Sequence, residues 1–284
     1  MIHLGKEKKE IHSVEPFKRE HESYYTIPGW KGVTAGITTK NGGVSSGPFH
    51  SFNMGLHVGD DRESVVENRR RLSELIGFPL ARWVAAEQTH GDCIELIDGL
   101  QAGKGSKIYD DAVPDTDGFL ASSGDLLLTM CYADCVPLYF YDPVKRRIGL
   151  AHAGWKGTVA KIGPSMIDRM VTAGSSKADI EVVIGPSICG DCYVVDDFVI
   201  GKIEKVLEDG PHIPYNLKEE GQYHLDLKQL NRLLLIQSGI SAEQIRTSGH
   251  CSFCHDDFYS YRQDGGKTGR MMSFIGWKEN VHER

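Results

Sequence analysis

The chain has 284 residues, a formal net charge of -7, 40% hydrophobic residues and 25% charged residues, which is ordinary for a soluble globular protein. Because no basic excess can neutralise phosphates, a nucleic-acid or anionic-membrane partner is disfavoured, whereas a small anionic substrate is not. Residues 1–17 lack the apolar run of a signal peptide, no segment approaches a membrane span, and seven cysteines are an odd count, so we expect a cytoplasmic protein with reduced thiols.

Hydrophobic periodicity and turn residues predict interleaved strands and helices. In chain order, the first half is expected to hold a charged N-terminal segment (1–29), a strand (32–39), a glycine-rich turn (41–47), a helix from Asp60 or Asp61 to the residue before Pro79, strands (82–88, 93–98) around the turn 89–92, and a polar loop (99–117). The second half is expected to hold strands (126–133, 136–142, 147–152), a glycine turn and helix (up to 174), a strand (180–185), helices (196–209, 224–239) and strands (244–249, 271–277).

This order has no strict strand–helix–strand rhythm, so it predicts mixed rather than doubly wound parallel sheets. We find no internal repeat, linker or low-complexity tract. The expected architecture is therefore an α/β (α+β) fold in which residues 30–284 form a single catalytic domain.

Three chemically reactive residues stand at the ends of apolar, strand-like runs: His90, Cys135 and His152. Two imidazoles and one thiol suit Zn²⁺ and leave a fourth position open, as in catalytic rather than structural zinc sites. The same residues could instead form a cysteine nucleophile with a histidine base. The spacing matches no local metal motif, so the site depends on a fold that brings the three strand ends together.

A possible anion site follows His152 directly. Gly154-Trp155-Lys156-Gly157-Thr158 leads into a helix, where free backbone N–H groups and Lys156 could hold a phosphate. A plain helix entry with Thr158 as N-cap explains the same residues equally well. The glycines at 91, 154 and 157 would let backbone approach the ligands closely.

Two C-x-x-C pairs, Cys189/Cys192 and Cys251/Cys254, lie too far apart in the sequence for a zinc ribbon. We therefore expect separately packed thiols and no structural zinc at these four residues. Copper is also less expected than zinc, because multicopper sites use H-x-H pairs, which this chain of 12 histidines lacks.

Eight segments then carry a resemblance to a known family. They are TTKNGGVS (38–45), SFNMGLHVGDD (51–61), ENRRRL (67–72), QTHG (88–91), ADCVPL (133–138), AHAGWKG (151–157), GPSIC with CYVV (185–195) and FYSYRQDGGKTGRM (258–271). In this order they closely resemble the YfiH/YlmD-type laccase-domain proteins, known as polyphenol oxidases and later as purine nucleoside phosphorylases. The resemblance spans residues 30–277. Lys40 departs from an arginine common there, which would lose a bidentate contact.

The resemblance implies an α/β/β/α sandwich and a zinc enzyme whose metal and catalytic residues are His90, Cys135 and His152. It implies phosphorolysis of adenosine, inosine, guanosine and 5′-methylthioadenosine, together with adenosine deamination by a metal-activated water. From motif position and chemistry we expect Asn53 and Gln88 to contact the nucleoside. We expect Lys156 and Arg262 to hold phosphate, and Asp134 to act as a supporting or acid/base group. Cys254 receives no role.

Two other functions stay open. One is a metal-free cysteine hydrolase that uses Cys135 with His152 or His90 as base, inhibited by alkylation but not by chelators. The other is a partner-binding protein of cell-wall or division biology with a vestigial site, which would turn over no nucleoside. The partners expected for the leading hypothesis are a small nucleoside and phosphate, without nucleic acid or membrane. The oligomeric state is left open.

Overall fold

Two six-stranded mixed sheets form the centre of the computed structural model, which describes residues 14–278 except 123, 209 and 211. The first sheet has the order β1 (Lys18–His21), β2 (Tyr24–Thr26), β3 (Val33–Thr38), β15 (Met271–Trp277), β7 (Leu127–Tyr132) and β4 (Trp83–Ala85). The second has the order β14 (Ile245–Thr247), β10 (Glu181–Ile184), β8 (Val136–Asp142), β9 (Arg147–Ala153), β6 (Gly118–Ser122) and β5 (Ile94–Ile97). Only β4–β7, β5–β6 and β10–β14 pair in parallel among the named strands, which confirms the expected mixed character.

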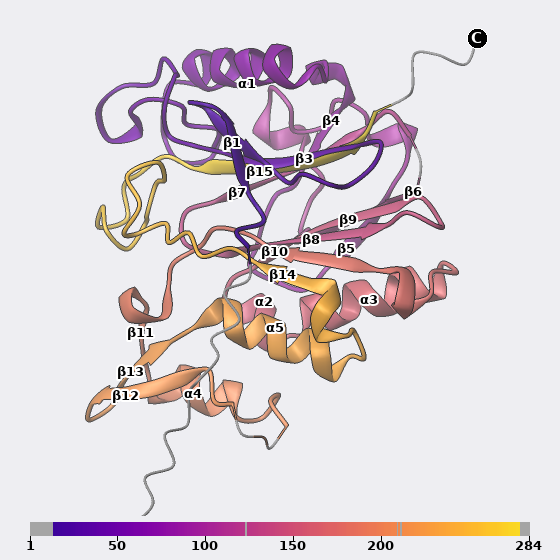
Figure 1. The fold of residues 1–284 in the computed structure, drawn as a ribbon. Coiled ribbons are helices and arrows are strands. Elements are labelled where there is room, and N and C mark those ends of the chain that lie inside the picture. Colours follow the sequence, from indigo (N-terminus) through magenta and orange to yellow (C-terminus); the bar gives the residue numbers. More distant parts are fainter. Residues whose placement is uncertain (1–13, 123, 209, 211, 279–284) are drawn as a thin grey trace, which may run out of the picture.

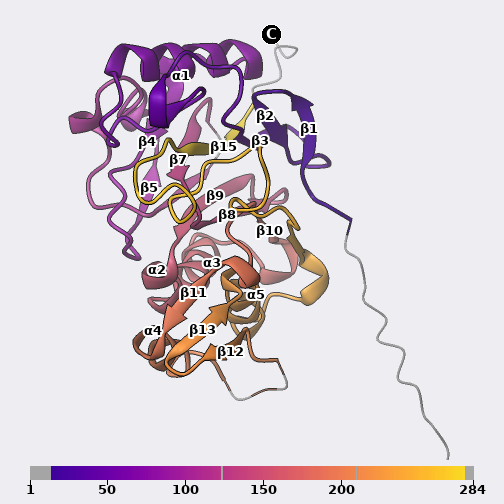
Figure 2. The same ribbon diagram turned by 90° about the vertical axis from the view of Figure 1, so that its left-hand side faces the viewer.

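Helices cover the outer face of each sheet (Figures 1 and 2). The first sheet carries α1 (Arg62–Ile76), and the second carries α2 (Trp155–Val159), α3 (Ile162–Thr172) and α5 (Leu227–Gln237). Beyond them lie α4 (Asp197–Ile203) and a small sheet of order β11 (Val194–Asp196), β13 (Gln222–Leu225) and β12 (Tyr215–Glu219). This is the α/β/β/α sandwich that the resemblance implied, in a single domain.

Three apolar clusters fill the spaces between these layers. Successive side chains of a strand point to opposite faces of its sheet, so one strand contributes to two clusters. In β7, Leu128 and Met130 point into the cluster between the sheets, whereas Leu127 points toward α1. In β8, Tyr139 faces the first sheet and Leu138 faces α3 and α5. Because both faces of these strands are covered, their sequences are continuous apolar runs rather than polar–apolar alternations.

The helix signals read from the sequence are largely confirmed. Asp61 caps α1 by accepting from the Ser64 N–H, and Gly77 ends the helix in the left-handed conformation. Asp226 caps α5 in the same way. The helix expected after Gly154 is two helices, because Lys161 takes a left-handed φ of 63° between α2 and α3. The helix expected at 196–209 ends at Ile203.

Other elements differ from expectation. The two strands predicted around the turn 89–92 belong to different sheets, β4 to the first and β5 to the second, which the sequence did not indicate. The strand β6 and the small sheet were not predicted, because β6 directly follows a polar loop and β12 is almost wholly exposed. By contrast, the N-terminal segment, expected as a peripheral strand or a loose end, supplies β1 and β2 at the edge of the first sheet, in agreement with the first alternative. Residues 1–13 of that segment lie outside the described part.

Within the described residues, no helix is both long enough and apolar enough to span a membrane.

Candidate active site

Chain crossings between the two sheets bring the three predicted ligands together. His90 lies in the connection from β4 to β5, Cys135 lies between β7 and β8, and His152 lies on β9. Their potential ligand atoms all lie within 4.8 Å of one another. The two imidazole rings are nearly perpendicular, with centroids 4.8 Å apart. The sequence prediction that these strand ends converge is thus confirmed.

Asp117 bonds to His152 and to the backbone on both sides of His90, although nothing in the sequence singled it out. Its fully buried carboxylate lies 2.7 Å from His152 Nδ1, and its other oxygen accepts the N–H groups of Gly91 at 2.7 Å and Thr89 at 3.1 Å. An ionised carboxylate only accepts, so Nδ1 of His152 donates to Asp117, and Nε2 is the nitrogen that would bind a metal once its own proton is lost. Such a carboxylate–histidine pair is the usual support of a metal-binding imidazole.

Glycine 154 is required by the crowding of the site. A Cβ at this position would lie 3.0 Å from Cys135 Sγ and 3.2 Å from His90 Cδ2. At Gly157 a Cβ would lie 2.8 Å from the Gly91 carbonyl oxygen. Both glycines therefore permit the close backbone approach that the sequence suggested.

Backbone strain marks two positions beside the ligands. His90 has a φ of 62° and Asp134 a φ of 95°, in the region that residues other than glycine rarely adopt. The Asp134 carboxylate accepts hydrogen bonds from Ser252 Oγ at 2.7 Å and from the Arg262 N–H at 2.8 Å. These bonds hold the strained residue and fix the segment that carries Arg262.

The buried thiol and imidazole shift each other's protonation. Burial alone would raise the pKa of Cys135, but the charges and hydrogen bonds of His152 and His90 outweigh it and lower the pKa to about 6. Burial alone would lower the pKa of His152, but the Cys135 thiolate and Asp117 raise it to about 9. The site thus favours a thiolate at neutral pH, the form that binds a metal or attacks an electrophile. One sulfur and two nitrogen donors fit zinc with an open position.

A cavity of about 510 Å³ opens above these ligands, within the size range of small-molecule sites. Four of the five predicted substrate residues line it, namely Gln88, Asp134, Lys156 and Arg262. The Gln88 amide already donates to the Cys131 carbonyl and accepts from the Cys131 N–H.

Asn53 does not line the cavity. It is fully buried, and its amide bonds to Gly55, Asp60 and the N–H of Arg270. Its contact with a nucleoside stays an untested prediction, and its bonds give it a supporting role beneath Arg270.

Sequence reasoning missed several lining residues, among them His57, Tyr193, Tyr261 and Arg270. Burial and the nearby charge of Arg270 lower the pKa of His57 to about 4, so its imidazole is neutral at pH 7. The Arg270 guanidinium lies over the Tyr261 ring, 5.7 Å from its centroid. His57 and Arg270 lie in segments that carried the resemblance, but nothing in those segments indicated which side chain faces the cavity.

Two further expectations are corrected here. Gly154, not Thr158, is the N-cap of α2, and Thr158 Oγ1 instead accepts from Asn231 inside the core. The two C-x-x-C pairs do not pack apart, because the four cysteines form one group. The physical reason is that β10 and β14 pair in parallel, and an isolated bridge from Ser187 to Cys251 continues that pairing beyond the strand ends.

Comparisons with known proteins agree with this geometry. The family model described as multi-copper polyphenol oxidoreductase laccase matches residues 34–278. A relative, purine nucleoside phosphorylase YlmD of Bacillus subtilis, is 46% identical over 278 residues, which is 95% of this chain and 100% of the relative. The crystal structure of YlmD from Geobacillus stearothermophilus matches with a TM-score of 0.92 and 44% identity over 94% of this chain and 100% of that one. The crystal structure of hypothetical protein YfiH from Bacillus licheniformis matches with a TM-score of 0.91 and 47% identity over 93% of this chain and 99% of that one.

Proposed function

The chain belongs to the family described as multi-copper polyphenol oxidoreductase laccase, and from that premise we propose that it is a zinc-dependent purine nucleoside phosphorylase. The observation that carries the proposal is the convergence of His90, Cys135 and His152 beside the cavity. The name of the Bacillus subtilis relative supports the reaction class. Bound to the three residues, zinc would supply a Lewis acid with an open coordination position.

The donor set supports zinc over copper, despite the family's description. Multicopper sites need many histidine ligands, including neighbouring pairs. Among the described residues, groups of three or more potential ligands occur at two places, one with two histidines and one with none. Asp117 fixes the tautomer of His152, which leaves Nε2 as the nitrogen directed to the metal.

Phosphorolysis requires a phosphate oxygen to attack C1′ of the ribose while the bond from C1′ to the purine nitrogen breaks. We assign the phosphate to the cations that line the cavity, Lys156, Arg262 and Arg270. The start of α2 beside Lys156 has no side-chain cap, so its N–H groups are available to the same anion. Asp134 acts by fixing the backbone of Arg262 rather than as an acid or base, because both its oxygens already accept hydrogen bonds.

The nucleoside is assigned to the aromatic part of the cavity, formed by Trp155, Tyr193 and Tyr261. The neutral imidazole of His57 offers either a donor or an acceptor to the polar edge of the base. We propose adenosine, inosine, guanosine and 5′-methylthioadenosine as substrates. We further propose deamination of adenosine, in which water replaces the C6 amino group and ammonia leaves. An open, polar-lined cavity is compatible with both reactions.

One observation favours a second candidate, a metal-free cysteine hydrolase. Burial would raise the pKa of Cys135, but His152 and His90 lower it. The resulting thiolate is the activated nucleophile that such an enzyme needs. The two functions respond oppositely to reagents. A chelator abolishes phosphorolysis by the zinc enzyme, whereas it leaves a cysteine hydrolase active.

The test combines elemental analysis with adenosine turnover, measured as adenine and inosine release with and without phosphate. Cys135→Ala should remove one equivalent of zinc and both activities while the circular dichroism spectrum stays native. Cys93→Ser, a thiol change outside the cavity lining, serves as the matched control. Undiminished zinc in folded Cys135→Ala protein, or wild-type turnover after chelation, would refute the proposal.

A further inference from the structure

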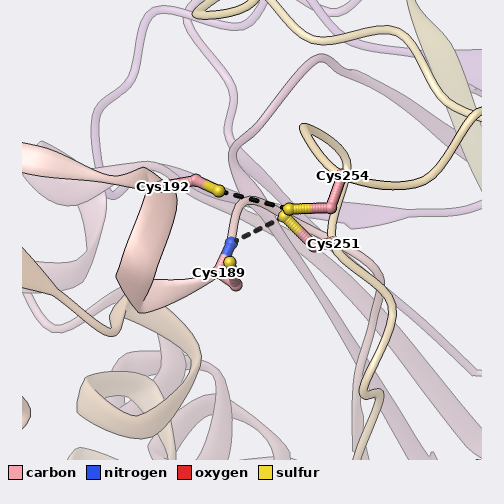
Figure 3. A group of neighbouring side chains, drawn as sticks. All are labelled: Cys189, Cys192, Cys251 and Cys254. Carbon is pink, nitrogen blue, oxygen red and sulfur yellow. Dashed lines mark hydrogen bonds between the residues drawn. The ribbon is translucent and has the colours of Figure 1, made fainter.

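The four cysteines of the two C-x-x-C segments converge from loops that are distant in the sequence. Cys189 and Cys192 flank the 3-10 turn Gly190–Cys192 between β10 and β11, whereas Cys251 and Cys254 lie in the turn that follows β14. The four sulfurs all lie within 4.8 Å of one another. Figure 3 shows both pairs of side chains directed into the same space.

From this convergence we propose that Cys189, Cys192, Cys251 and Cys254 bind a second zinc ion, which is structural rather than catalytic. Four thiolates fill a tetrahedral zinc and leave no open position, in contrast to the site of His90, Cys135 and His152. Zinc–sulfur bonds of about 2.3 Å place tetrahedral sulfurs roughly 3.8 Å apart. The sulfurs of Cys192 and Cys254 are 3.2 Å apart, so small side-chain adjustments suffice to admit the ion.

The surroundings support a bound anionic metal complex. The Cys189 N–H donates to Cys251 Sγ at 3.2 Å, the kind of bond that stabilises a coordinated thiolate. The buried Lys228 ammonium donates to the carbonyl oxygens of Ser248 and His250, immediately before Cys251. Zn²⁺ with four thiolates carries two net negative charges, which this nearby cation partly offsets.

The glycine between the first two cysteines is also demanded by the local packing. At Gly190 a Cβ would lie 3.2 Å from the Cβ of Asp226, the residue that caps α5. The C-G-D-C turn therefore rests directly on the start of that helix. Because this turn packs against the start of α5, the sulfurs of Cys189 and Cys192 are held in fixed positions.

The proposed zinc joins the two loops that wall the catalytic cavity. Tyr193 follows Cys192 directly, and Arg262 belongs to the segment after Cys254; both residues line the cavity. The same two loops meet at Asp134, whose carbonyl oxygen accepts from the Ile188 N–H and whose carboxylate accepts from Ser252 Oγ. The structural zinc thus holds the cavity wall in place while the other metal serves the reaction.

Elemental analysis and native mass spectrometry of the full chain test the assignment. Wild-type protein should hold two zinc ions, Cys192→Ser/Cys254→Ser one, and the combination with Cys135→Ala none. Replacement of zinc by Co²⁺ in Cys135→Ala protein should give the intense sulfur-to-metal absorption of a four-thiolate site. Cys93→Ser again serves as the control. Because the two metals are counted in separate variants, failure of the proposed function would leave this result standing.

The readout of function should also separate the two sites. Cys192→Ser/Cys254→Ser is expected to raise KM for the nucleoside more than it lowers kcat, and to lower the unfolding midpoint, because the wall loosens while the catalytic ligands remain. In wild-type protein a mercurial that blocks all accessible thiols should release two zinc ions, which counts both sites without any variant that must fold. A zinc content that Cys192→Ser/Cys254→Ser does not lower in folded protein, or a disulfide between these cysteines in freshly purified protein, would overturn the assignment.

Discussion

Replacement of Asp117 by asparagine probes the centre of the site, because one carboxylate bonds to the His152 ring and to the backbone on both sides of His90. One of its oxygens lies 2.7 Å from His152 Nδ1, and the other accepts from the Gly91 N–H at 2.7 Å and the Thr89 N–H at 3.1 Å. Asparagine keeps the shape of the side chain but replaces one acceptor with an NH₂ donor. No orientation of the amide reproduces all of these bonds.

Two orientations are available, and each weakens metal binding. If the NH₂ group faces His152, it donates to Nδ1, the ring proton moves to Nε2, and the ligand nitrogen is lost. If it faces Gly91 and Thr89, two partly buried N–H groups lose their acceptor and meet a donor instead, so the backbone around His90 loosens. Loss of such a supporting contact lowers metal affinity by roughly 10–100-fold, or about 1.4–2.8 kcal/mol.

The assay sets the free zinc concentration with a chelator buffer and finds the concentration that restores half of the phosphorolysis activity. Asp117→Asn should shift this midpoint to higher zinc by the stated factor. Asp92→Asn makes the same change on an exposed carboxylate that directly follows Gly91 and should leave the midpoint in place. An unshifted midpoint in folded Asp117→Asn protein would refute the argument that this carboxylate orients the ligands.

Three further predictions follow from the site. Gly154→Ala should lower zinc affinity at least about tenfold, because the new Cβ would lie 3.0 Å from Cys135 Sγ; Gly201→Ala, with nothing within 4 Å, is the control for the same chelator titration. In metal-stripped protein, alkylation of Cys135 should be fast above and slow below a pH of about 6, because the two histidines outweigh burial in setting the pKa of the thiol. Peptide mass spectrometry measures the rate, and a midpoint near ~8.5 would contradict the thiolate. Lys156→Ala should reduce phosphate-dependent adenine release more than water-dependent inosine release, with the exposed Lys202→Ala as control, and an equal fall in both products would place phosphate elsewhere.

The three candidate metal ligands could be predicted from the sequence because each ends an apolar, strand-like run. Asp117 could not, since it follows other acidic residues in a polar loop and nothing local distinguishes it. Its place depends on the pairing of β6 with β9, where Gly118 opposes Ala151 and the preceding residue therefore lies beside His152. Because the strand β6 was not predicted, the position of the Asp117 carboxylate beside His152 could not be predicted either.

The fold shows the same limit. The caps of α1 and α5 and the apolar strands of both sheets are local signals, so they could be predicted from short windows of sequence. Which sheet a strand joins is not a local property, so the sequence could predict strands on both sides of the turn 89–92 but not that β4 and β5 belong to different sheets. The prediction that the two C-x-x-C pairs pack separately was wrong for the same reason. Their loops meet because β10 and β14 are parallel neighbours, which no short window of sequence indicates.

His90 and Cys135 lie on two of the connections between the sheets, so a metal bound there would link its occupancy to the stability of the whole sandwich. A ligand that binds only the folded state stabilises it by about 2.7 kcal/mol at a free concentration of 100 times its dissociation constant. Here that free energy stabilises the packing of the two sheets against each other, and not only the conformation of one loop. Amide hydrogens at the starts of β5 and β8 should therefore exchange more slowly as zinc is added, and cells short of zinc would hold a protein that opens between its layers more often.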